Sequence, residues 1–276
     1  MNRRSSLLRS AAAYPHIVWS ILFIIAPMLF VLYYTFTTEA GDFTLDNIVN
    51  LANPDYLSIF ARSICFAIVA TFICLVIAYP LAYFISRMSA QKQRIILLFL
   101  MLPMWMNLLI RTYSWMNILE ISGIVNTLLG KIGLGPYKML GNSSAVVLGM
   151  VYNFLPYMVM PICTVMGKID KSLLEAAGDL GCNGLRTLTH VVMPLSVSGV
   201  ISGITMVFVP SVSTFYISQK MGGGNFDLIG DTIERQFMLN YDYNMGASLS
   251  FVLMILIFIS LAVMNRFGDE DGGIVV

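Results

Sequence analysis

The residues of this chain that could bind or react are concentrated in one polar stretch, EAAGDLGCNGLRTLTHVVMP, which runs from Glu175 to Pro194. The stretch carries carboxylates, an arginine, a histidine and a cysteine, and the chain on either side of it is almost entirely apolar. None of the four cysteines forms a CxxC pair, and two histidines are too few for a metal site by themselves. We therefore expect neither disulfide nor metal chemistry here, and look instead for a polar surface feature.

The spacing within this stretch predicts two short helices. Ser172 and Glu175 fit the S-x-x-E pattern, in which the serine caps the helix start and the glutamate reaches back to the serine amide. Gly181 is suited to ending that helix in a left-handed conformation. A second helix is expected to start near Asn183 and to run towards Val192. The sequence thus predicts a compact helix-turn-helix.

The composition places this feature on a membrane protein. Of the 276 residues, 58% are hydrophobic and only 11% are charged, and the mean hydropathy is +0.79. Soluble domains carry about 25% charged residues, so this composition argues against a large soluble globule. The net charge of +1 argues against a nucleic-acid partner.

Apolar runs long enough to cross a bilayer recur along the whole chain. They predict an all-α integral membrane protein that forms a single domain over residues 1–276, without a cleavable signal peptide. The six expected spans cover about residues 17–36, 63–85, 95–119, 144–166, 197–218 and 246–264.

The distribution of basic residues predicts the orientation of these spans, because short cytoplasmic loops are enriched in lysine and arginine. Five basic residues fall on the side opposite to the polar stretch: Arg62, Lys131, Lys138, Lys220 and Arg235. Ten fall on the same side as the polar stretch: Arg3, Arg4, Arg9, Arg87, Lys92, Arg94, Lys168, Lys171, Arg186 and Arg266. Both termini and the polar stretch are therefore expected in the cytoplasm.

Prolines within the expected spans predict bent helices, since each proline removes a backbone donor. The bends have two readings, packing irregularity or helices that line a path across the membrane. The six prolines are Pro27, Pro80, Pro103, Pro156, Pro161 and Pro210.

The polar stretch resembles the EAA loop of ABC importer permeases. That loop reads E-A-A, three residues, Gly, nine residues, then I-x-L-P; here Val191 and Met193 stand in place of the usual Ile and Leu. The resemblance implies the type I importer permease (MetI-like) fold, with six transmembrane helices and a cytoplasmic coupling helix between the fourth and the fifth. The matching positions are Glu175, Ala176, Ala177, Gly181 and Pro194.

Further segments are similar to the PotB-type permeases of spermidine/putrescine importers, and the likeness covers about residues 17–264. The segments are FTLDNI (Phe43–Ile48), NLLIRTYSW (Asn107–Trp115), GMVYNFLPYMVMP (Gly149–Pro161) and MGGGNFDLIGDTIERQF (Met221–Phe237). The resemblance implies import of polyamines across the bacterial inner membrane. It also implies three partners: a second, PotC-like permease, a dimer of PotA-like ATP-binding subunits and a PotD-like extracytoplasmic binding protein.

The chain itself is not expected to be an enzyme, because it lacks the Walker A pattern that holds ATP phosphates. ATP and magnesium would be bound by the partner ATPase. By resemblance, the helix from Ser172 to Leu180 docks in a cleft of that ATPase, with Glu175 meeting polar or basic groups and the two alanines permitting close approach. The residues expected to couple to the ATPase are Ser172, Glu175, Ala176, Ala177 and Gly181.

A polyamine would need acidic or aromatic partners along its path. The expected spans contain no Asp or Glu, which leaves cation–π contacts with tyrosines and the side-chain carbonyl of an asparagine. Acids of the last outer loop, which include Asp227, Asp231, Glu234 and Asp242, could attract a cation, dock the binding protein or form a solvated face. The candidate pathway residues are Tyr152, Asn153, Tyr157, Tyr216 and Asp227.

Other functions remain possible at this stage. The same machine could import an organophosphonate, thiamine or a metal chelate, because relatives with other substrates share the EAA loop. An ion-coupled secondary transporter is expected to carry intramembrane acids or unwound ion sites, and no such acids are present. No catalytic sequence pattern supports the alternative of an integral-membrane enzyme.

Overall fold

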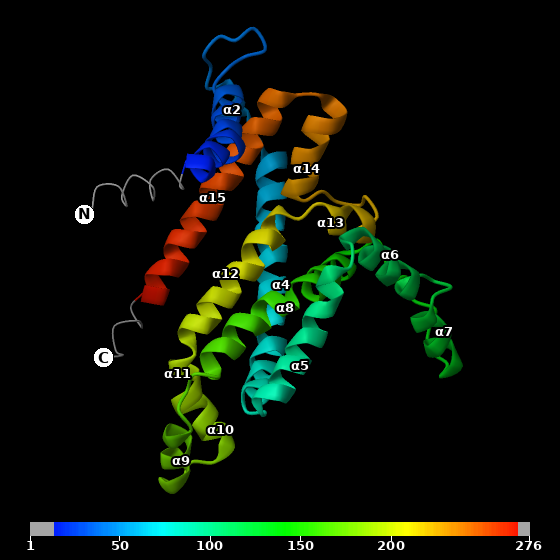
Figure 1. Ribbon diagram of the computed structural model, residues 1–276. Coiled ribbons are helices and arrows are strands. Elements are labelled where there is room, and N and C mark those ends of the chain that lie inside the picture. The colour runs from blue at the N-terminus through cyan, green and yellow to red at the C-terminus, as the bar shows by residue number, and fades with distance from the viewer. Residues whose placement is uncertain (1–13, 270–276) are drawn as a thin grey trace, which may run out of the picture. The chain divides into compact units, whose positions relative to one another are not determined.

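The computed structural model describes residues 14–269, and this part of the chain is helical apart from its loops and one isolated antiparallel bridge between Thr37 and Phe43 (Figure 1). In chain order, the helices are η1 (Ile21–Ile25), α2 (Ala26–Thr35), α3 (Asp46–Asn50), α4 (Pro54–Ser86), α5 (Ala90–Met101), η2 (Leu102–Trp105), α6 (Leu108–Leu119), α7 (Ile124–Lys131), α8 (Ser143–Met166), α9 (Lys171–Asp179), α10 (Gly184–Thr187), η3 (Leu188–Val192), α11 (Met193–Leu195), α12 (Val197–Ser213), α13 (Tyr216–Met221), α14 (Ile229–Arg235), η4 (Gln236–Asn240) and α15 (Tyr243–Asp269).

Six membrane crossings are present if each bent helix pair counts as one crossing. Four are continuous helices: Tyr14–Thr35, Pro54–Ser86, Ser143–Met166 and Tyr243–Met264. The first, second, fourth and sixth predicted spans lie within or largely within these helices. The other two crossings are pairs, Ala90–Trp105 with Leu108–Lys131 and Gly184–Leu195 with Val197–Ser213, bent by 93° and 71°.

The third expected span, residues 95–119, is bent in the structure, but the break lies after Pro103, at Met106. The chain leaves the helical conformation at Met106, where ψ is 148°, and α6 begins at Leu108. Asn107 causes the restart, because its side chain accepts a hydrogen bond from the Leu109 amide at 2.7 Å and so caps the new helix. The bend therefore comes from a polar cap inside an apolar run.

The fifth span also differs from its predicted range, residues 197–218. Helix α12 ends at Ser213 because Thr214 is extended, with ψ of 139°, and the separate short helix α13 follows. The sharp bend of this crossing lies at Ser196, between α11 and α12, and not at Pro210, which is inside α12.

The described chain separates into two compact units. The first contains the residues up to Leu57 together with Thr232–Ile255. Within it, the Asn244 side chain donates to the backbone carbonyls of Tyr34 and Thr37, and the rings of Phe36 and Phe251 meet edge to face at 5.6 Å.

The second unit, Ser58–Asp231 with the chain from Leu256 onward, contains α8 at its core. Helix α12 crosses α8 closely because two glycines, Gly199 and Gly203, lie at the contact. An added Cβ would come within 3.0 Å of the Pro161 carbonyl at Gly199 and within 2.7 Å of the Met158 sulfur at Gly203. This G-x-x-x-G spacing lets two membrane helices approach at the backbone.

The loop after α13 is tied into the second unit by buried hydrogen bonds. Asp231 is only 4% exposed and accepts from the Ser218 hydroxyl at 2.9 Å and from the Leu228 amide at 2.8 Å. The Ile229 amide donates to the Ser63 hydroxyl of α4 at 2.8 Å. The expectation that Asp231 belongs to a cation-attracting or solvated outer face is therefore wrong; this carboxylate holds the loop.

Candidate functional site

The predicted coupling segment forms α9, but its first residue is capped differently from the prediction. The cap is Asp170, whose carboxylate accepts a hydrogen bond from the Ser172 amide at 3.0 Å. That bond lowers the pKa of Asp170 below its ordinary value. Ser172 lies one residue inside the helix, so the predicted Ser172–Glu175 capping box is wrong and Glu175 remains an exposed side chain.

The other end of α9 confirms the prediction for Gly181. This glycine is left-handed, with φ of 80°. The Cys182 amide donates to the Ala177 carbonyl at 3.0 Å and the Gly181 amide to the Gly178 carbonyl at 2.9 Å, which is the Schellman pattern of helix termination. A Cβ at Gly181 would meet nothing within 4 Å, so backbone conformation and not space requires the glycine.

Helix α9 buries one face and leaves another apolar face uncovered. Ala177 is 6% exposed and packs within the chain, so the prediction that both alanines face a partner is wrong for Ala177. Leu173, Ala176 and Leu180 are exposed and share a side of the helix through their i, i+3, i+7 spacing. Leu180 is 86% exposed. Neither leucine was among the residues expected to couple to the ATPase.

The second half of the segment connects α9 to the fifth crossing. It begins at Asn183, as predicted, where the side chain accepts from the Arg186 amide at 2.9 Å. Helix α9 packs on η3, which continues through α11 to the bend at Ser196. Ser196 is fully buried and its hydroxyl shares a hydrogen bond of 2.9 Å with the Tyr79 hydroxyl of α4.

Two candidate pathway residues, Tyr152 and Asn153, are neighbours on α8. The Tyr152 ring meets Trp115 of α6 edge to face, with centroids 5.1 Å apart. Asn153 is 4% exposed; its amide donates to the Gly149 carbonyl at 2.8 Å, while its own side-chain oxygen is buried without a hydrogen-bond partner. A buried acceptor of this kind is costly and is suited to receiving a donor.

Tyr216 lies in a different cluster, on α13. Its ring centroid lies 5.8 Å from the ammonium nitrogen of Lys220, and that nitrogen also lies near the ring of Tyr113 of α6. Burial raises the pKa of Tyr216 above 10.0, and the interaction with Tyr113 acts in the same direction.

The remaining candidates are Tyr157 and Asp227. Tyr157 is 42% exposed and its ring lies 6.5 Å from that of Phe154. Asp227 is half-buried in the loop after α13. Among the residues that the structure describes, no ring contact joins Tyr152, Tyr157 and Tyr216, so the predicted pathway is not one continuous aromatic surface.

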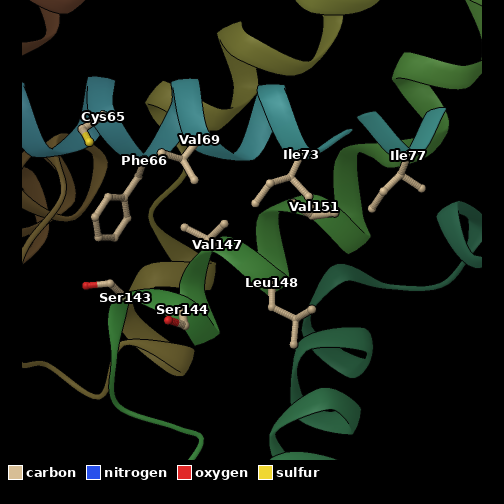
Figure 2. Close-up of a pocket in the computed structure, with 10 residues that line it drawn as sticks. All are labelled: Cys65, Phe66, Val69, Ile73, Ile77, Ser143, Ser144, Val147, Leu148 and Val151. Carbon is tan, nitrogen blue, oxygen red and sulfur yellow. The ribbon is translucent and has the colours of Figure 1, made fainter. Parts of the chain in front are cut away.

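A cavity of about 530 Å³ lies between α4 and α8 in the second unit. Figure 2 shows the side chains that line it. Its wall is apolar apart from a thiol and two hydroxyl groups, and none of the candidate pathway residues belongs to it. A cavity with this lining suits a hydrocarbon chain better than a polycation. The lining residues are Cys65, Phe66, Val69, Ile73, Ile77, Ser143, Ser144, Val147, Leu148 and Val151.

Solved structures share this fold. The chain resembles a subunit of a bacterial alginate ABC transporter in complex with an alginate pentasaccharide-bound periplasmic protein, with a TM-score of 0.81, 14% identity, and coverage of 99% of this chain and 98% of that one. An amino acid ABC transporter with histidines gives a TM-score of 0.51 and 12% identity, covering 80% and 96% of the two chains.

Several relatives are more similar to this chain in sequence than these structures are. The spermidine/putrescine transport system permease protein PotB of Escherichia coli K12 is 37% identical over 256 residues, which cover 90% of this chain and 93% of PotB. PotB of Haemophilus influenzae is 34% identical, with 90% of each chain covered. The inner membrane ABC transporter permease protein YdcU of E. coli K12 is 28% identical, with 87% and 82% covered.

A family profile described as "binding-protein-dependent transport system inner membrane component" matches residues 75–268, a range that includes α9, the bend at Ser196 and α13. With this match and the PotB relatives along nine-tenths of its length, the chain belongs to the family of binding-protein-dependent transport system inner membrane components.

Proposed function

We propose that this chain is the permease subunit of an ATP-driven importer that carries polyamines, spermidine or putrescine, from a binding protein across the inner membrane. The observation that carries the substrate assignment is the 34–37% identity to PotB permeases over 90% of the chain. The six spans expected from the sequence contain no Asp or Glu, which is compatible with a cation that is passed along aromatic rings and is not held tightly.

In this proposal, α9 is the coupling helix that docks in the ATPase. Its exposed stripe of Leu173, Ala176 and Leu180 supplies apolar contact, and Glu175 beside the stripe meets polar or basic groups of the partner. Ser172 shares the exposed polar side. Asp170 caps the first turn of α9 and Gly181 ends its last turn. The helix can therefore transmit force from the ATPase without unwinding at its ends.

The movement would reach the membrane through the bend at Ser196. Helix α9 packs on η3, and η3 leads into α11 and α12. The Tyr79–Ser196 hydrogen bond gives the bend a fixed point on α4. A shift of α9 would therefore turn α12 about this point and change the packing of α12 against α8 at Gly199 and Gly203.

The proposed assembly follows from the family. The chain is a multi-pass inner-membrane protein, and we propose that its termini and α9 are cytoplasmic because ten basic residues lie on that side against five on the other. Arg3, Arg4 and Arg9, which contribute to this count, lie outside the described residues. The proposed partners are a second, PotC-like permease, a pair of PotA-like ATPases that bind ATP and magnesium, and a PotD-like binding protein.

Uptake by the reconstituted complex tests this function. Vesicles that contain the two permeases and the ATPases, with the binding protein supplied outside, should accumulate labelled spermidine or putrescine only when ATP is present inside. Uptake of thiamine, an organophosphonate or a metal chelate in place of polyamines would reject the substrate assignment. Uptake that persists without ATP and collapses with the ion gradient would reject the ATP-driven mechanism.

A further inference from the structure

Two tyrosine rings of the second unit converge on the positive charge of one lysine. The ammonium nitrogen of Lys220 lies 5.9 Å from the ring centroid of Tyr113 and 5.8 Å from that of Tyr216. Both distances are within the range of about 6 Å in which an aromatic face attracts a cation.

The convergence is built by packing between elements and does not come from local spacing alone. Tyr216 and Lys220 are four residues apart on α13, which by itself places them on one side of that helix. Tyr113 comes from α6, against which α13 packs. Its ring reaches the same ammonium group from a distant part of the sequence.

The adjacent side of α13 is buried in the core. Ile217 and Met221 are 0% and 1% exposed, and they press against Gly149 of α8. A Cβ at Gly149 would come within 2.5 Å of the Met221 sulfur and within 2.7 Å of the Ile217 side chain. This close contact fixes α13, so the Tyr216 side faces α6. Tyr113 is 47% exposed, which leaves the tyrosine pair accessible from outside the core.

The Lys220 side chain between the rings has the same chemical groups as the end of a polyamine. A lysine side chain is an ammonium group on a four-carbon stem, and putrescine and one arm of spermidine end in the same aminobutyl group. A site that accepts Lys220 in this geometry therefore has the shape and the charge preference for that arm. Two tyrosine rings offer attraction without a fixed carboxylate, which favours release as well as binding.

We propose that Tyr113 and Tyr216 form an ammonium-binding site that Lys220 fills in the absence of substrate and that an aminobutyl end of a polyamine takes in its place during transport. Lys220 is then a built-in competitor that weakens substrate binding in the permease. This inference rests on the proposed polyamine function, because a substrate without an ammonium group has no reason to displace the lysine.

The test is equilibrium binding of radiolabelled putrescine and spermidine to the complete permease–ATPase complex in lipid nanodiscs, without the binding protein. Lys220→Met removes the competing charge and keeps the length of the side chain, so the dissociation constant should fall about three- to tenfold, as expected for one or two cation–π contacts. Lys220→Arg keeps a cation over the rings and should stay near the wild-type value. Lys131→Met, at an exposed position on α7, is the matched control for loss of one positive charge.

A double variant separates a binding site from a structural clamp. If the tyrosines bind the substrate ammonium, Tyr216→Leu in the Lys220→Met background should cancel the gain in affinity. An unchanged or weaker affinity for Lys220→Met, or an equal gain for Lys131→Met, would overturn the inference.

Uptake by the wild-type complex distinguishes the two possible failures. Normal polyamine uptake with no gain in binding for Lys220→Met would reject the ammonium site and leave the proposed function intact. Absence of polyamine uptake by the wild type would reject the proposed function, and with it the exchange of Lys220 for a polyamine.

Discussion

Single residues fix the two ends of α9. Asp170 supplies the acceptor for the first turn, and Gly181 supplies the left-handed residue that closes the last turn. Each makes its contribution through the backbone and leaves the exposed side chains of the helix available. Residue changes at these two positions should therefore act on the helix itself before they act on any partner.

Replacing Asp170 should loosen the start of α9. Asp170→Ala removes the acceptor for the Ser172 amide, so hydrogen exchange of the first-turn amides should become faster, whereas Asp170→Asn keeps a capping oxygen and should change exchange much less. The lowered pKa of Asp170 means that the folded state favours the carboxylate. Its stabilising effect is thus present above the ordinary pKa of 3.8 and is lost as the pH falls through the lower folded value. Equal exchange in the alanine and wild-type proteins would contradict this role.

Gly181→Ala should destabilise the end of α9 by about 1–2 kcal/mol, because a Cβ disfavours the left-handed conformation. Gly181→Asn should cost less, since asparagine tolerates that region. Amide exchange at Gly181 and Cys182 measures the change. Gly178→Ala is the matched control. It adds the same methyl group at an exposed position within α9, where a Cβ meets nothing within 4 Å. Because alanine favours a helix more than glycine does, this variant should slow amide exchange. Faster exchange in both variants would rule out a conformational requirement at Gly181.

Among the elements, α13 depends on close contact with α8. Gly149→Ala would force a Cβ to within 2.5 Å of Met221, so it should destabilise the protein by about 1–3 kcal/mol through overpacking. The midpoint of thermal unfolding in detergent measures this loss. Gly130→Ala on α7, where a Cβ meets nothing within 4 Å, is the control and should not lower the midpoint. Similar midpoints for the two variants would mean that α13 does not pack closely against α8 at Gly149.

The bend between α11 and α12 depends on the hydrogen bond between Tyr79 and Ser196. Tyr79→Phe removes the hydrogen bond between α4 and the bend, at a cost of about 1 kcal/mol, and leaves the Ser196 hydroxyl bonded to the Met193 carbonyl. If the bend transmits force, the ratio of substrate imported to ATP hydrolysed should fall while insertion stays normal. Tyr83→Phe, one turn further along α4, is the control for loss of a phenol hydroxyl. An unchanged ratio in Tyr79→Phe would remove the bend from the transmission path.

At the scale of the whole molecule, the sequence predicted the membrane crossings well because apolar runs of bilayer length leave few alternatives. It did not predict the break at Met106. The break depends on Asn107, which caps a helix, and one polar residue changes the mean hydropathy of a long apolar run very little. The close crossing of α8 and α12 was also missed, although Gly199 and Gly203 carry a recognisable G-x-x-x-G spacing. Both features depend on single residues and not on composition.

The candidate site was predictable only in part. The EAA pattern located α9 and Gly181, but local pattern matching chose Ser172 as the cap because the competing acceptor, Asp170, lay just outside the motif. Ala177 was assigned to the partner face because sequence alone does not say which side of α9 packs on η3. The pairing of Tyr113 with Tyr216 joins α6 to α13, and no local spacing predicts such a contact.

The central claim is that an exposed apolar surface on α9 receives the ATPase. The most direct measurement is ATPase retention, together with polyamine uptake, for the complex that carries Leu180→Glu. Leu180 is 86% exposed, so the charge should leave the folded permease and its unfolding midpoint unchanged. The account predicts that the ATPase no longer copurifies and that uptake is lost, whereas Leu134→Glu, at an exposed position in the loop after α7, keeps both. Full ATPase retention and normal uptake with Leu180→Glu would contradict the account.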